Sequence, residues 1–171
     1  MSIDYKLLKE KLSQKGIDLD VKADKLGRGI EEKIKPLLLV LNDLGYHTSA
    51  SCEGHSLDEF KKRIQKTQEE YHFEQEITEE DKYHIILKKK FGQMYGNITF
   101  DQSPWVHLEI SDEQVKNLNS IINEYNKLNN IPCTLEKLEK SYRLSFEYTH
   151  SDVELQQEIP KLAEFIYNKS I

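Results

Sequence analysis

The chain has 171 residues, of which 32% are charged and 37% are hydrophobic, and its formal net charge is -6. This length suits one domain, residues 1–171, with a core large enough to fold without disulfides or structural metals. The negative charge gives no general attraction to phosphate backbones, so it argues against nucleic-acid binding, without excluding a local basic patch.

The sequence carries no sign of export or of membrane insertion. Residues 1–6 lack the apolar stretch of a signal peptide, and no apolar run is long enough to span a bilayer. The two cysteines, Cys52 and Cys133, lie far apart, so we expect free thiols and no structural disulfide. We therefore expect a cytoplasmic protein without a membrane partner.

The first two predicted elements are amphipathic helices. Leucines at positions 7, 8 and 12 predict a helix that ends at Gly16, so residues 1–28 form an N-terminal helix and a connector. Apolar residues then recur at helical spacing over residues 30–44. This second helix ends at Gly45, and Pro36 must either begin its regular part or kink it.

A short strand and a charged excursion follow. Residues 46–52 are rich in β-formers and predict a strand that ends near Cys52. Ser56 and Glu59 fit a capping box, so a helix should begin at Leu57. The charged sequence over residues 57–96 predicts an inserted helical excursion, although residues 83–87 could instead form a strand.

The remaining sequence predicts two hairpins, each followed by a helix. Residues 97–100 and 105–110 flank a turn, and Ser111 then caps a helix with a clear apolar stripe up to residue 128. Residues 133–138 and 142–148 predict the second hairpin. Ser151 caps a final helix in which Pro160 requires a kink or a restart. The order of elements predicts an α+β fold, with a largely antiparallel sheet and helices packed on one face.

Alternation along the strands sorts side chains between two faces of this sheet. Val106, Leu108 and Ile110 are apolar and oppose Trp105, His107 and Glu109. In the first strand, alternation sends Cys52 to the core side. A shared sheet would gather eight residues on its second face: His47, Ser49, Ser51, Trp105, His107, Glu109, Arg143 and Glu147. This face is either the floor of a ligand site or a solvated surface.

The spacing Cys52-x-x-His55 is one that metal sites use. A thiolate and an imidazole suit zinc, and His107 could complete the site with them, as could His150, His47 or a carboxylate. The alternative is a buried neutral cysteine and a histidine near a helix cap.

The loop between Ser51 and Ser56 also suits an anion or a small molecule. Gly54 permits a tight turn, and backbone amides at the start of the next helix could lower the pKa of the Cys52 thiol, with His55 as its acid–base partner. Asp58 stands where the Cys-x5-Arg pattern of phosphotyrosine phosphatases requires arginine, which argues against phosphoryl transfer by this thiol. The structural alternative assigns Gly54 to the turn and Ser56 to the cap.

A resemblance to known proteins covers residues 41–55. Its residues are Leu41-Asn42-x-x-Gly45-Tyr46, followed by a strand and Ser51-Cys52-Glu53-Gly54-His55, and they resemble a segment of small bacterial and phage proteins without established activity. The Ser-Cys-x-Gly core is also similar to Ser-Cys-Ser-Gly-Arg in the tRNA wybutosine-synthesising methyltransferase family. That similarity implies an S-adenosylmethionine-dependent RNA methyltransferase, with Ser51, Cys52 and Gly54 as site candidates.

Three hypotheses for function follow. The first is a small-ligand or metal-binding domain, whose site at Ser51–Ser56 has Cys52 and His55 as catalytic candidates. Further ligand contacts would come from Trp105, His107 and Glu109. The second is an S-adenosylmethionine-dependent tRNA-modifying enzyme. The third is a non-catalytic interaction domain that uses the charged residues 65–90 as its partner surface.

Overall fold

A computed structural model of the chain describes residues 3–20, 30–52, 54, 103–147 and 152–170. These residues all belong to one compact unit, formed by Met1–Gly54 and Ser103–Ile171. The helical excursion predicted for residues 57–96, the strand predicted for residues 97–100, and the site candidates His55 and Ser56 lie outside the described residues.

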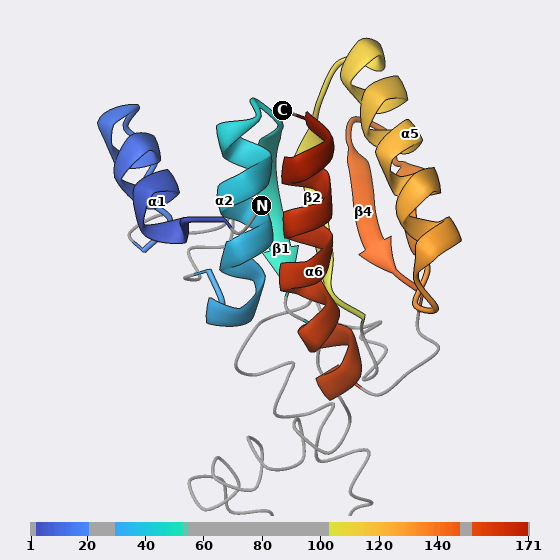
Figure 1. Cartoon of the computed structure of the whole chain (residues 1–171). Helices are drawn as coiled ribbons and strands as arrows, with labels where there is room; N and C mark the ends of the chain where they lie inside the picture. The colour runs from blue at the N-terminus through green and yellow to red at the C-terminus, as the bar shows by residue number, and fades with distance from the viewer. Residues whose placement is uncertain (1–2, 21–29, 53, 55–102, 148–151, 171) are drawn as a thin grey trace, which may run out of the picture. The chain divides into compact units, whose positions relative to one another are not determined.

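The described residues form an antiparallel four-stranded sheet with helices on one face (Figure 1). The strands are β1 (His47–Cys52), β2 (Trp105–Glu109), β3 (Cys133–Lys137) and β4 (Tyr142–Phe146). Their order across the sheet is β1-β2-β4-β3, and each neighbouring pair is antiparallel. The predicted α+β fold class is therefore confirmed.

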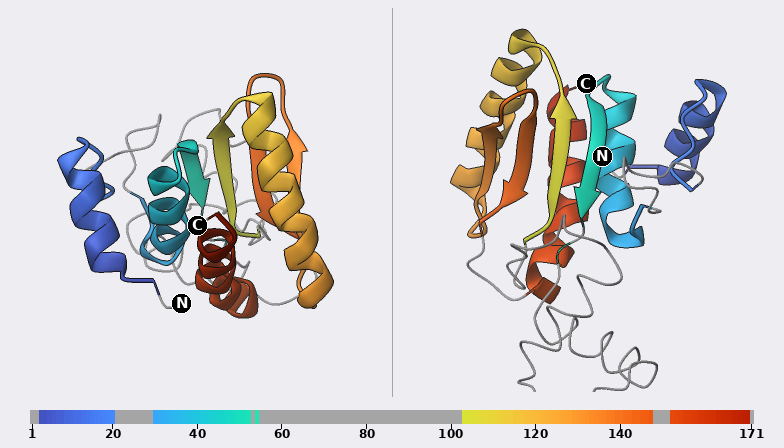
Figure 2. Two further views of the ribbon diagram at one scale, coloured as in Figure 1. Left: turned by 45° about the horizontal axis from the view of Figure 1, so that its top comes forward. Right: turned by 180° about the vertical axis from the view of Figure 1, so that it is seen from behind.

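Helices α2 (Lys35–Asp43), α5 (Asp112–Leu128) and α6 (Asp152–Ser170) lie on the same face of this sheet. The view from behind in Figure 2 shows the strands in front of these helices. Helix α1 (Tyr5–Gln14) lies beside α2, and a 3-10 turn, Glu32–Ile34, leads into α2. None of the helices that the structure describes is both long and apolar enough to cross a membrane.

The predicted helix boundaries are largely confirmed by local geometry. Pro36 lies in the first turn of α2, where a missing N–H costs no hydrogen bond, and Gly45 adopts a φ of 83° beyond its end. At the start of α5, Ser111 and Gln114 form both hydrogen bonds of a capping box. These three positions mark both ends of α2 and the start of α5.

Helix α6 runs through Pro160 without a restart. A proline inside a helix costs about 3 kcal/mol. Five apolar side chains of this helix are completely buried, and each of the four leucine and isoleucine side chains among them contributes roughly 1.5 to 3 kcal/mol, so burial outweighs the proline penalty. These residues are Leu155, Ile159, Leu162, Ala163 and Ile166.

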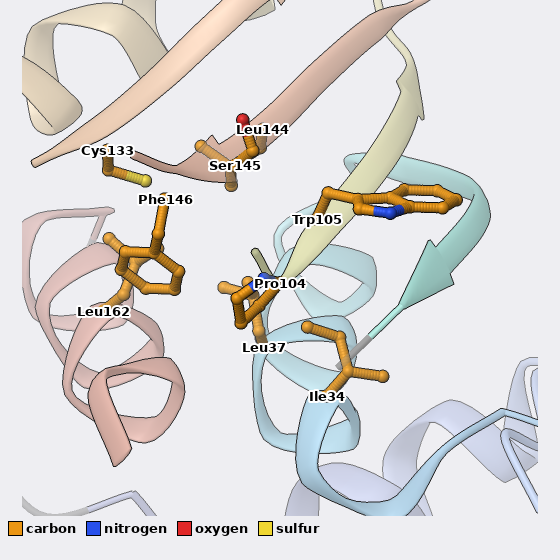
Figure 3. Close-up of a pocket in the computed structure, with 9 residues that line it drawn as sticks. All are labelled: Ile34, Leu37, Pro104, Trp105, Cys133, Leu144, Ser145, Phe146 and Leu162. Carbon is orange, nitrogen blue, oxygen red and sulfur yellow. The ribbon is translucent and has the colours of Figure 1, made fainter. Parts of the chain in front are cut away.

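The hydrophobic core lies between the sheet and the helices. Val106, Leu108 and Leu144 project into it from the two central strands and are at most 1% exposed. An apolar pocket at one end of the core is lined by Ile34, Leu37, Pro104, Trp105, Cys133, Leu144, Ser145, Phe146 and Leu162 (Figure 3). It leaves no space for a water molecule, so we interpret it as a packing seam and not as a ligand site.

Candidate functional site

The polar face of the sheet is built mainly by the central strands β2 and β4. Trp105 pairs with Ser145, and His107 pairs with Arg143. Directly opposed residues of antiparallel strands project from the same face, and the intervening pair Val106 and Leu144 is buried in the core. Trp105, His107 and Arg143 therefore lie on the face opposite the helices, where all three are half-buried.

These three side chains contact one another and form what we call the Trp105–His107–Arg143 cluster. The ring centroids of Trp105 and His107 are 4.5 Å apart, with an angle of 36° between the planes. The Cζ atom of Arg143 lies 5.4 Å from the Trp105 ring centroid, within the range of a cation–π interaction. The cluster thus combines an aromatic surface with a positive charge.

A hydrogen bond orients the guanidinium within the cluster. Arg143 Nε donates to His107 Nε2 at 3.0 Å. An imidazole nitrogen can accept only when it carries no proton, so this contact requires neutral His107 with its proton on Nδ1. The Nε donor of Arg143 is thereby used, while its two terminal Nη groups carry the remaining donors.

The terminal groups of Arg143 have no carboxylate partner among the residues that the structure describes. Glu136 lies directly opposite Arg143 on β3 but is exposed and forms no ion pair with it. On β2, the other neighbour of β4, the Glu109 carboxylate lies 3.9 Å from His47 Nε2, and both of these side chains are substantially exposed. Within the described part of the chain, the half-buried guanidinium is therefore held by an imidazole and an indole rather than by an acidic residue.

A β-bulge in β1 corrects the predicted orientation of Cys52. Thr48 pairs with Leu108, but the register shifts before Ala50, which pairs with His107. Ser51 then pairs with Val106 on the core side, and Cys52 pairs with Trp105 on the polar face. Strict alternation had assigned these two residues the opposite way, and it was wrong because the extra residue in the bulge reverses the faces that follow it.

Cys52 is buried although it lies on the polar face. Its side chain is absent from the hydrophobic core cluster, yet the residue is only 8% exposed. The Gly54 N–H donates to Cys52 Sγ at 3.4 Å, and Gly54 has the positive φ of 87° that the predicted tight turn requires. Both cysteines of the chain are free.

The backbone at Gly54 is tied to α6 by a buried glutamine. Gln156 Nε2 donates to the Gly54 carbonyl at 3.0 Å, and Gln156 Oε1 accepts from Lys33 Nζ at 2.6 Å. Gln156 is only 7% exposed, so these bonds satisfy its buried amide. The position of Gly54, and through it that of Cys52, is therefore fixed from the helical layer.

Comparisons with known proteins give no family for the chain. No family model, curated protein or solved structure matches it. Its function must therefore be argued from the geometry of the site.

The structure brings together only part of the site predicted from the sequence. Trp105, His107 and Cys52 share one face, and Glu109 lies further along the same face of β2. Within the described ranges, no three His, Cys, Asp or Glu side chains are grouped so that they could hold a metal ion. Because His55 lies outside these ranges, the zinc site remains a prediction.

Arg143 is the main residue that the predicted site lacked. Alternation had placed it on the polar face, because Tyr142, Leu144 and Phe146 mark the opposite side of its strand. Its contact with His107 depends on which strands are neighbours and on their register, and neither is encoded locally. The signal for its face was present in the sequence, but the signal for its partner was not.

Proposed function

We propose that the chain is a small-ligand-binding domain whose site is the polar face of the sheet at the Trp105–His107–Arg143 cluster. The observation that carries the proposal is the convergence of an indole, an imidazole and a guanidinium, of which the guanidinium has no carboxylate partner among the described residues. Ligand sites typically combine apolar surface with a few polar groups that fix orientation. The cluster supplies both on two adjacent strands of the sheet.

The ligand would stack against exposed parts of Trp105 and take its polar contacts from the neighbouring side chains. Aromatic rings prefer offset or tilted packing, so a planar ligand gains both buried area and favourable ring geometry. Cys52 lies directly opposite Trp105 on the adjacent strand. This arrangement supports binding, and we assign no chemical step to it.

The proposal can be tested by a thermal-shift screen of mononucleotides, aromatic carboxylates, inorganic phosphate and S-adenosylmethionine. A ligand at 100 times its Kd should stabilise the fold by about 2.7 kcal/mol and raise Tm by roughly 5 to 10 °C. Trp105 is the sole tryptophan of the chain, so quenching of intrinsic fluorescence would locate a hit at the cluster. Calorimetry should then show that Trp105→Ala abolishes binding.

His47→Ala provides the matched control, because His47 is exposed and lies on the same face of the sheet away from Trp105. It should bind each hit as the wild type does. A screen without any stabilising compound would overturn the proposal, as would a hit whose affinity is unchanged by Trp105→Ala.

Zinc binding is a second candidate, because the bulge places Cys52 on the same face as His107. Cys52 pairs with Trp105 and is a diagonal neighbour of His107 across the two strands. Metal analysis of the purified protein tests this candidate. We expect stoichiometric zinc in the wild type and its loss in Cys52→Ser, and the absence of zinc from both samples would contradict it.

A further inference from the structure

We infer that the ligand of the cluster carries an oxyanion, a carboxylate or a phosphate, and that Arg143 binds it through its two terminal Nη groups. This inference rests on the proposed ligand-binding function and names the chemistry of the ligand. It begins from the placement of Arg143 on a central strand, half-buried and hydrogen-bonded to His107.

The first argument concerns charge. Removing a cation from water is costly unless an opposite charge or several hydrogen bonds replace the lost hydration. Arg143 receives one hydrogen-bond acceptor from His107 and the face of an indole, and the described residues supply no carboxylate within ion-pair distance. A bound anion would provide the missing opposite charge.

The second argument concerns direction. A guanidinium can present its donors either along the Nε side or along the Nη end, and His107 already occupies Nε. The cation–π contact with the Trp105 ring further limits where the planar group can lie. The remaining donors therefore form a paired fork whose spacing matches two oxygens of a carboxylate or a phosphate.

The third argument concerns ligand size. The chain has a net charge of -6, and Arg143 is the only arginine among the described residues. A polyanion would require several phosphate contacts and would meet unfavourable overall electrostatics. A small molecule with a single anionic group beside a planar ring fits one fork and one aromatic surface.

The experiment uses three compounds with the same ring and different head groups: benzoate, phenyl phosphate and benzamide. Binding is followed by NMR through the single indole N–H signal, which belongs to Trp105. Wild-type protein should bind at least one of the two anions more tightly than neutral benzamide. Comparison of benzoate with phenyl phosphate then distinguishes a carboxylate site from a phosphate site.

Arg143→Gln should weaken binding of the preferred anion by about 10- to 100-fold, the loss expected for hydrogen bonds to a charged group. Binding of benzamide should change little. Lys137→Gln is the control, since it removes one positive charge from an exposed position on β3 and should leave both affinities unchanged. If the two variants weaken anion binding equally, the effect comes from net charge and not from the paired Nη donors of Arg143, which would overturn the inference.

His107 acts in this scheme as a positioning residue. His107→Leu removes the acceptor for Arg143 Nε and should weaken anion binding several-fold, whereas His107→Gln retains an acceptor oxygen and should restore much of it. A purely structural role would not distinguish these variants by the head group of the ligand.

The outcomes separate this inference from the proposed function. If the anions and benzamide bind equally well and Trp105→Ala abolishes binding of all three, the ligand site stands and the oxyanion inference fails. If none of the three compounds shifts the indole signal, the oxyanion inference fails, and the broader screen decides the proposed function.

Discussion

Replacement of Tyr125 by phenylalanine should destabilise the fold by about 2 kcal/mol. The Tyr125 hydroxyl donates to Glu158 Oε2 at 2.9 Å, and this bond joins α5 to α6 inside the helical layer. Tyr125 is 1% exposed and Glu158 8%, so water cannot readily replace the lost donor. Hydrogen bonds to charged groups contribute about 1.5 to 3 kcal/mol. Lys161 still contacts the other carboxylate oxygen, which keeps the expected loss near the middle of that range.

Two other tyrosines provide a graded comparison for this measurement. Tyr46 accepts a hydrogen bond from the neutral and exposed Asn117 at 3.2 Å, so Tyr46→Phe should cost about 0.5 kcal/mol. Tyr142 is half-buried, and its hydroxyl has no hydrogen bond to the rest of the described chain, so Tyr142→Phe should change stability by less than about 0.5 kcal/mol.

Urea denaturation followed by circular dichroism gives the free energy of unfolding for all three variants. In thermal denaturation of this 171-residue chain, a loss of about 2 kcal/mol in Tyr125→Phe should appear as a decrease of roughly 4 to 8 °C in Tm. Equal losses in Tyr125→Phe and Tyr142→Phe would refute the reasoning, because both changes remove a hydroxyl group and only that of Tyr125 forms a buried hydrogen bond within the described chain.

Two further predictions concern the start of β3. Burial raises the pKa of the Cys133 thiol above its ordinary value of 9.0, so above pH 9 the unfolded chain loses this proton while the folded chain keeps it. The stability advantage of wild type over Cys133→Ala should therefore fall by about 1.4 kcal/mol between pH 8 and pH 10, and parallel stability profiles would contradict this. The Asn126 side chain makes two 2.8 Å hydrogen bonds to the Cys133 backbone, so Asn126→Ala should cost about 2 kcal/mol in urea denaturation. Asn129→Ala removes one hydrogen bond to a helix carbonyl and should cost about half as much. A larger loss of stability in Asn129→Ala than in Asn126→Ala would show that the two hydrogen bonds to β3 are unimportant.

The sequence predicted those elements whose signals are local. The stripe of α5 includes Leu118, Ile121 and Ile122, all at most 5% exposed, and its capping box begins at Ser111 as the spacing indicated. These signals depend on residues within one or two helical turns, so they survive in any tertiary context. The α+β class followed from the order of the elements, because short strands beside one another in the chain favour antiparallel pairing.

The candidate site depended on long-range pairing and was predicted less completely. His107 and Arg143 are 36 residues apart, and their contact follows from the position of β4 between β2 and β3. Several strand orders are compatible with the same pattern of apolar and polar residues. Alternation could therefore assign each residue to a face of its own strand, but it could not identify the residue opposite it on the neighbouring strand.

The bulge in β1 has a consequence for the hypotheses drawn from the sequence. Strict alternation places Cys52 on the core side, away from the face that holds Trp105 and His107, although the first hypothesis drew ligand contacts from all three residues. The shift between Thr48 and Ala50 places Cys52 opposite Trp105. Such a bulge needs only one extra residue, and the short polar residues of β1 give no strong apolar pattern to oppose it. Cys52 and the Trp105–His107–Arg143 cluster therefore lie on one face of the sheet, and variants of Cys52 and Arg143 should be tested against the same ligands.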